Sequence, residues 1–117
     1  MLNVLHKPLQ PIILDNTEHY CCPDENDIGT NIICVQLTND LLEFCKKRNI
    51  LLSVPQKRRN SIISLTPKLT EGMLFPFCVL RWREFQILGK APKIDLERSH
   101  VKTLQFIKLD VLEEYKL

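Results

Sequence analysis

The chain has 117 residues, of which 44% are hydrophobic and 26% are charged, a composition typical of a globular protein. We expect one domain over residues 1–117 from the length of the chain. On folding, such a chain buries roughly two thirds of the surface that its unfolded form exposes, so it needs no metal or disulfide to fold. The formal net charge of +2 does not favour a nucleic-acid or membrane-surface partner, and no run approaches the roughly 20 apolar residues that cross a bilayer. The N-terminus lacks the pattern of a signal peptide, so we expect a cytoplasmic protein.

The N-terminal part of the chain predicts extended backbone followed by a loop. Pro8 and Pro11 exclude a helix over residues 1–14 and favour an extended segment, either along the surface or as an edge strand. Residues 15–31 are rich in Asp, Asn and Glu, and they predict one long polar loop.

A strand and a helix follow this loop. The β-branched run over 32–37 predicts a buried strand. Thr38 is placed to cap a helix over 39–48, and Asn49 is placed to end it.

The middle of the chain has the weakest pattern. Residues 50–72 predict a loop with at most a short strand near 62–65. The apolar run that follows contains Pro76, which removes a backbone donor, so we expect a strand only after it, over 77–80.

The clearest helix signal lies near the only tryptophan. A helix is expected over 81–88, ended by Gly89 and Pro92. Trp82 is expected to anchor the core, with its indole N–H bonded to a backbone carbonyl in the long loop. Residues 93–96 then predict a short strand.

Two further helices complete the prediction. Ser99 is expected to open a helix over 99–106, and the spacing of Asp110 and Glu113 predicts a capping box for a helix over 110–116. Together these elements predict an α+β fold, in which three to four helices pack on a small, mostly antiparallel sheet.

These landmarks, in this order, resemble the mostly bacterial domain-of-unknown-function family 2237. The matching pieces are Asn3-Val4-Leu5, Cys21-Cys22, Asp27-Ile28-Gly29, Cys34, Leu37-Thr38, Leu42-Glu43-Phe44, Ser53 to Pro55, Cys78, Arg81-Trp82-Arg83-Glu84, Gly89, Ala91-Pro92, Leu96, His100 and Leu109 to Leu112. The resemblance covers nearly the whole chain, and it implies a compact single-domain α+β fold rather than an activity.

The chain departs from this family pattern at three places. The segment before the paired cysteines is shortened to residues 17–20, Asn31 replaces a histidine, and Phe75-Pro76 replace a Trp-Cys pair. An activity that used those polar groups would be weakened or absent in this chain.

The cysteines offer an alternative reading as a zinc- or thiol-dependent enzyme. The odd number of cysteines and the adjacent pair argue against a disulfide framework and favour reduced thiols. A zinc site would use Cys21, Cys22, Cys34 and Cys78, joined by His19. Alternatively, Cys21 or Cys22 would act as a nucleophile with His19 or His100 as base, although the acidic loop nearby opposes thiolate formation. We expect no catalysis and no cofactor, and keep zinc as the alternative.

A second alternative is an association with nucleic acid through the basic residues Lys57, Arg58 and Arg59. No aromatic residues interleave with this run, so no stacking platform for bases is visible. We therefore do not expect nucleic acid as the partner.

The leading hypothesis is a small protein that binds a ligand or a protein partner. The candidate ligand-binding residues are Asp27, Arg81, Trp82, His100, Cys21 and Cys22, and we expect them where loop 17–31 meets Trp82 and His100. The plainer interpretations are an ion pair of Arg81 with Glu84 or Asp95, and a neutral His100 bonded to neighbouring backbone. A homodimer through the apolar N-terminal strand is also left open.

Overall fold

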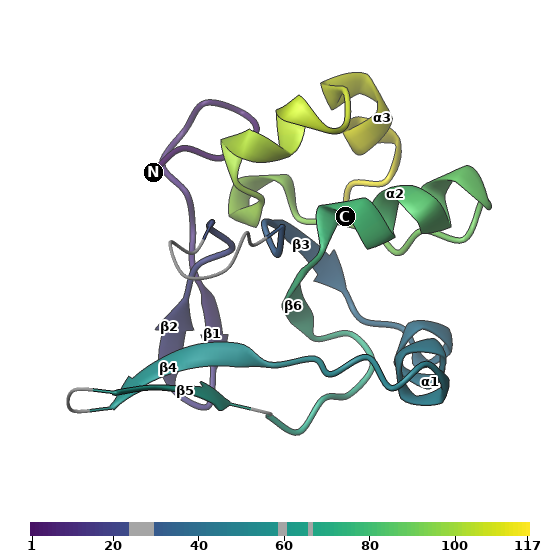
Figure 1. Ribbon diagram of the computed structural model, residues 1–117. Coiled ribbons are helices and arrows are strands. Elements are labelled where there is room, and N and C mark those ends of the chain that lie inside the picture. The colour runs from purple at the N-terminus through teal and green to yellow at the C-terminus, as the bar shows by residue number, and fades with distance from the viewer. Residues whose placement is uncertain (24–29, 59–60, 66) are drawn as a thin grey trace.

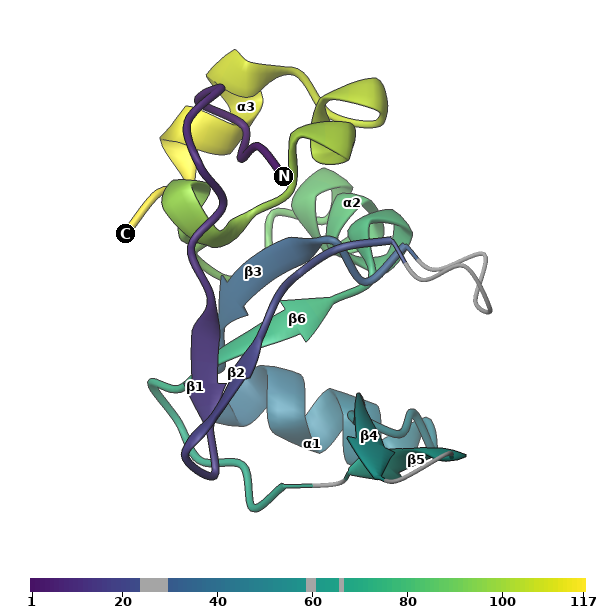
Figure 2. The same cartoon turned by 90° about the vertical axis from the view of Figure 1, so that its left-hand side faces the viewer.

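The centre of the molecule is an antiparallel pair of strands, β3 (Ile33–Gln36) and β6 (Leu74–Phe77). The computed structural model describes residues 1–23, 30–58, 61–65 and 67–117, with backbone only over 55–58 and 61–65. Helix α1 lies on one side of the pair, and α2 and α3 lie on the other (Figures 1 and 2). The first three residues of β3 have no exposed surface, so this strand lies inside the hydrophobic core.

Pro76 lies inside β6, directly opposite Cys34. The prediction of a strand that begins after Pro76 is therefore wrong, and residues 79–87 form helix α2 instead. The Cys34 backbone bonds away from β6, because its N–H donates to Ser99 Oγ (2.9 Å) and its carbonyl accepts from the Asp95 N–H (3.0 Å). The Cys34–Pro76 position is thus a non-hydrogen-bonded one, and the missing proline N–H removes nothing from the ladder.

The strand predicted over 93–96 is reduced to a bridge at Ile94. Ile94 pairs with Val35, and Gln36 donates its N–H to the Lys93 carbonyl at 2.8 Å. The segment continues as a 3₁₀ helix over Leu96–Arg98. The N–H groups of Glu97 and Arg98 donate hydrogen bonds to the Asp95 carboxylate. This local cap competes with extended backbone and ends the strand after one residue.

Helix α1 (Asn39–Lys47) begins as predicted and ends one residue earlier than predicted, with Arg48 as its C-cap. Thr38 Oγ1 accepts a hydrogen bond from the Leu41 N–H at 3.1 Å, which satisfies one of the free donors at the helix start. Asn49 has a φ of +53° and ends the helix in the left-handed conformation that Asn tolerates.

Helix α2 (Val79–Ile87) begins two residues earlier and ends one residue earlier than predicted. Gly89, which follows the C-cap Leu88, has a φ of +72°. Trp82 has no exposed surface. Its indole N–H donates to the Pro92 carbonyl at 3.1 Å, and its ring contacts Tyr115 edge-on at 5.2 Å. The prediction of a core anchor is confirmed, but the acceptor lies just beyond α2 and not in the long loop.

Two hairpins flank the central pair. Strands β1 (Ile12–Leu14) and β2 (Thr17–His19) are joined by Asp15 and Asn16, both with positive φ, as a type I′ turn requires. Residues 17–19 of the predicted long loop are therefore a strand. The second hairpin consists of β4 (Val54–Arg58) and β5 (Ser61–Leu65), so the weak pattern over 50–72 contains two strands.

The C-terminal helices differ in their bounds and caps from the helices predicted over 99–106 and 110–116, and the first of them is a 3₁₀ helix. The segment after Ser99 forms a 3₁₀ helix over Val101–Gln105 that is capped by His100, and α3 spans Leu109–Glu114. Lys108 occupies the N-cap of α3, so the predicted capping box at Asp110 does not form.

The described residues thus contain three two-stranded antiparallel sheets instead of one small sheet. The α+β class is confirmed. No helix among the described residues is long and apolar enough to cross a membrane.

Candidate functional site

Trp82 and His100, the centre of the predicted ligand site, both have structural partners. His100 Nδ1 accepts a hydrogen bond from the Lys102 N–H at 3.0 Å. Burial lowers the pKa of His100, and the charges of the chain N-terminus and Lys102 lower it further. Its imidazole is therefore neutral, as expected, because the acceptor nitrogen must stay unprotonated. Ligand binding by these two residues stays a prediction, and Asp27 lies outside the described residues.

The cysteines do not form a metal centre in the part of the chain that the structure describes. No disulfide joins them, and no three or more His, Cys, Asp or Glu side chains there are placed to hold a metal ion. The pKa of the buried Cys21 is raised well above its usual value, first by its hydrogen bond with Cys34 and then by burial. A thiol with a raised pKa stays protonated, which opposes the proposed nucleophile.

Cys78 belongs to a different environment, a cavity of about 360 Å³ between the end of α1 and the start of α2. We call it the arginine cavity. Its lining residues are Asn31, Arg48, Asn49, Ile50, Leu51, Leu52, Phe77, Cys78 and Arg81. Of the predicted ligand-binding residues, Arg81 lines this cavity, while Cys78 comes from the metal alternative.

The end of α1 places Arg48 at this cavity. The chain leaves the helix through paired bonds, from the Asn49 N–H to the Lys46 carbonyl (3.3 Å) and from the Ile50 N–H to the Cys45 carbonyl (2.8 Å). This is the Schellman arrangement, which fixes the direction of the chain after the helix. The guanidinium carbon of Arg48 lies 5.1 Å from the centroid of the Phe44 ring, a cation–π contact that orients the side chain.

The start of α2 places Arg81 on the same cavity. The Val79 N–H donates to the Thr30 carbonyl at 2.7 Å, and the Thr30 hydroxyl and the Cys78 thiol are 2.9 Å apart. These contacts hold the first turn of α2 against the segment that precedes β3. Arg81 follows Cys78 by three residues, so both side chains lie on one side of the helix.

An aromatic cluster sets the spacing of the two arginines. Phe85 of α2 contacts Phe44 of α1 edge-on, with ring centroids 4.8 Å apart, and lies 6.3 Å from Phe77. Because Phe44 also supports Arg48, the same contacts that pack the helices position both cationic ends.

The described lining of the cavity is positively charged. No carboxylate belongs to it among the residues that the structure describes, and neither Arg48 nor Arg81 has an ion pair within the same ranges. Asp95, a predicted partner of Arg81, instead pairs with Arg98 at 2.7 Å. The positive end of the α2 dipole at Cys78 adds charge of the same sign.

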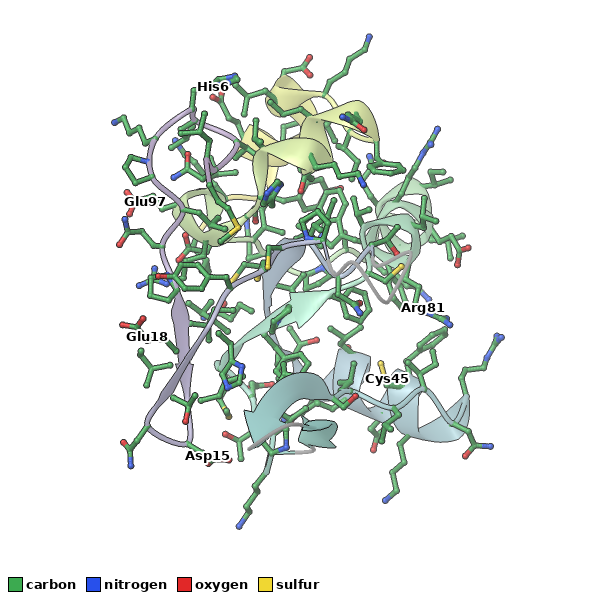
Figure 3. All side chains as sticks on the ribbon, turned by 60° about the vertical axis from the view of Figure 1, so that its left-hand side comes forward. His6, Asp15, Glu18, Cys45, Arg81 and Glu97 are labelled. Atoms are coloured by element: carbon green, nitrogen blue, oxygen red, sulfur yellow. The ribbon has the colours of Figure 1, made fainter. Side chains whose placement is uncertain are left out.

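Electrostatics also indicate where the Arg81 side chain lies. Burial raises the pKa of the Cys45 thiol in α1, and the positive charge of Arg81 opposes this rise. Figure 3 shows Arg81 and Cys45 near one another, between the two helices. The charge of Arg81 therefore lies close enough to α1 to act on the Cys45 thiol.

Sequence reasoning did not find Arg48, Asn49 and Asn31. Lys46, Lys47 and Arg48 all stand near the C-terminal end of the predicted helix, where positive charge suits the helix dipole, so this pattern does not single out Arg48. The spacing of Phe44 and Arg48, four residues apart on one helix face, was the available signal that Arg48 is held in place.

Comparison with known proteins gives a family. The family model described as "Uncharacterized protein conserved in bacteria (DUF2237)" matches residues 2–116. The chain belongs to the DUF2237 family. The match confirms the resemblance in the order of short motifs along the chain, and no curated protein matches this DUF2237 chain. Membership in DUF2237 supplies no biochemical role, so the geometry of the site has to carry the functional argument.

Proposed function

We propose that this DUF2237 protein binds a small anionic ligand in the arginine cavity, without catalysis of its own. The observation that carries the proposal is the convergence of Arg48 and Arg81, from two different helices, on one cavity whose described lining has no carboxylate. Two guanidinium groups held near each other repel, and an oxyanion between them removes that cost. Arginine also offers the paired N–H donors that carboxylate and phosphate oxygens accept.

The surrounding residues support this assignment. Asn31 and Asn49 add amide groups to the same lining, which suit the oxygen atoms of a ligand. The volume of about 360 Å³ lies at the small end of the usual range for ligand sites, about 300–1,000 Å³, which favours a small molecule over a macromolecular partner.

The alternatives receive less support from the described residues. The proposed zinc ligands do not gather into a metal-binding group there. The basic run of the nucleic-acid alternative offers no test, because Arg59 lies outside the described residues, as do the side chains of Lys57 and Arg58.

A calorimetric titration with citrate and with inorganic phosphate tests the proposal. Arg81→Gln and Arg48→Gln should each weaken binding about tenfold or more, because each removes charge-assisted hydrogen bonds. Both side chains are exposed, so the variants should stay folded, and circular dichroism checks this.

Matched controls separate the site from general attraction of anions. Arg83 lies exposed on α2, and Lys47 lies exposed at the end of α1, and neither lines the cavity. Arg83→Gln and Lys47→Gln should leave the affinity within about twofold. Equal losses in all four variants, or no titratable binding by the unmodified protein, would refute the proposal.

A further inference from the structure

The apolar part of the lining of the arginine cavity points to the class of ligand. We infer that the anion is a monocarboxylate with an aliphatic chain, its carboxylate at the two arginines and its chain along an apolar wall. This inference rests on the proposed function and adds the chemistry of the ligand to it.

The apolar wall is made by Ile50, Leu51, Leu52 and Phe77. Leu51 is 68% exposed, although its neighbours Ile50 and Leu52 pack partly against the core. The Schellman turn at Asn49 sets the direction of the chain after α1. The residues that follow it, Ile50, Leu51 and Leu52, line the same cavity as the two arginines. An inorganic anion bound at the two arginines would leave Leu51 in contact with water. The chain of an aliphatic acid would cover this side chain, and the burial of apolar surface would favour binding.

The polar residues of the cavity suit a flat carboxylate group. The Phe44 ring lies against the Arg48 guanidinium, so the N–H groups at the edge of that plane are the ones that remain available. A planar carboxylate accepts two of these N–H groups in parallel. Arg81 and the Asn31 amide then lie on the same lining to complete the oxygen contacts.

Affinity along a homologous series tests the inference. The probes are acetate, butyrate, hexanoate and octanoate, titrated calorimetrically into the folded protein, with inorganic phosphate as the probe of the arginines alone. Affinity should rise about threefold to fourfold per added methylene while the chain covers the wall. Arg81→Gln should weaken binding of every member of the series by a similar factor.

A pair of leucine variants locates the aliphatic chain. Leu51→Ser should lower the affinity for octanoate by about fivefold or more and leave acetate and phosphate unchanged, because only the long chain reaches the wall. Leu88→Ser is the matched control, because Leu88 is 69% exposed at the C-cap of α2 and does not line the cavity. It should change none of these affinities.

The outcomes distinguish the two claims. If phosphate binds through Arg48 and Arg81 but affinity does not rise with chain length, the inference about the ligand is overturned and the proposed anion site stands. The same holds if octanoate gains affinity equally in the unmodified protein and in Leu51→Ser. If neither phosphate nor any carboxylate binds, both claims are overturned.

Discussion

The N-cap of the helix after Ser99 is His100, and not Ser99 as the sequence predicts. Serine is a common N-cap, but Ser99 is fully buried, where its hydroxyl accepts from the Cys34 N–H and donates to the Asp95 carbonyl at 2.8 Å. The cap of the next helix is left to His100, through Nδ1. Sequence reasoning could not assign these roles, because the Cys34 partner of Ser99 is 65 residues away.

The cap at His100 predicts that acid destabilises the fold. The pKa of His100 is lowered below 6.5 by burial and nearby positive charge, so the unfolded chain takes up a proton more readily than the folded one. The contribution of His100 to stability is complete above about pH 6.5 and is lost as pH falls through the lowered pKa. Denaturant unfolding at pH 7.5 and pH 5 measures this loss.

His100→Asn gives the decisive comparison, because asparagine can cap the helix but does not titrate. The variant should match the unmodified protein within about 1 kcal/mol at pH 7.5 and lose less stability at pH 5. An unchanged loss in the variant would show that His100 is not responsible. His19, whose pKa burial also lowers, would then be the next residue to replace.

Among Cys21, Cys34, Cys45 and Cys78, we expect Cys78 to react fastest with an alkylating reagent. It is half-buried and lines the arginine cavity, whereas Cys21, Cys34 and Cys45 are buried. The reactive form of a thiol is the thiolate, and the pKa values of Cys21 and Cys45 are raised. Iodoacetamide at neutral pH, followed by peptide mapping of Cys22→Ser protein, should label Cys78 first, and phosphate should slow that labelling. Earlier labelling of Cys21 or Cys45 would contradict this.

Among the elements, α1 was predicted well and the two central strands less well. Thr38 and Asn49 cap α1 from adjacent positions, so both signals are local and visible in the sequence. The course of β6 through Pro76 depends on which side of Cys34 carries its hydrogen bonds, and that is decided by Ser99 and Asp95 far along the chain. Local patterns therefore placed α1 to within one residue, and long-range partners decided the strands.

The arginine cavity follows the same rule. Arg81 could be singled out because it stands beside the only tryptophan, whereas Arg48 gains its role from the way Phe44 and Phe85 bring two helices together. No periodicity within either helix records that contact between segments 41 residues apart.

The turn after α1 should be sensitive at Asn49. With a φ of +53°, this position favours glycine or asparagine, and other side chains there cost roughly 1–2 kcal/mol. We expect Asn49→Ala to lower the free energy of unfolding by about 1 kcal/mol and Asn49→Gly to leave it unchanged or slightly raised. Urea denaturation distinguishes these outcomes, and equal losses in both variants would mean that the amide, and not the backbone, stabilises the turn.

At the scale of the whole molecule, Trp82 joins α2 to the C-terminal segments. Its N–H bond reaches Pro92, its ring contacts Tyr115, and the Tyr115 carbonyl in turn accepts from the Ile94 N–H beside β3 at 2.8 Å. The end of the chain is thereby connected to the central strands. Sequence composition indicated an anchor here, but the identity of its partners depended on the tertiary fold.

Trp82→Phe should therefore be strongly destabilising. It removes a buried hydrogen bond, leaves the Pro92 carbonyl without its donor and opens space in the core, for a combined loss of about 2–4 kcal/mol. Thermal unfolding followed by far-UV circular dichroism measures the loss, and Leu88→Ala, at an exposed position on the same helix, should stay within about 0.5 kcal/mol. Similar effects of both variants would contradict the anchoring role.

The proline in β6 has one more consequence. Pro76 is buried, and its nitrogen lies on the side of the strand away from β3, where the described sheet has no third strand. Any other amino acid at this buried position would place a backbone N–H group on that edge without a neighbouring strand to accept its hydrogen bond, at a cost of roughly 1–3 kcal/mol. A residue that disrupts most strands is thus tolerated in this one, because it brings no N–H group to the edge that has no partner strand.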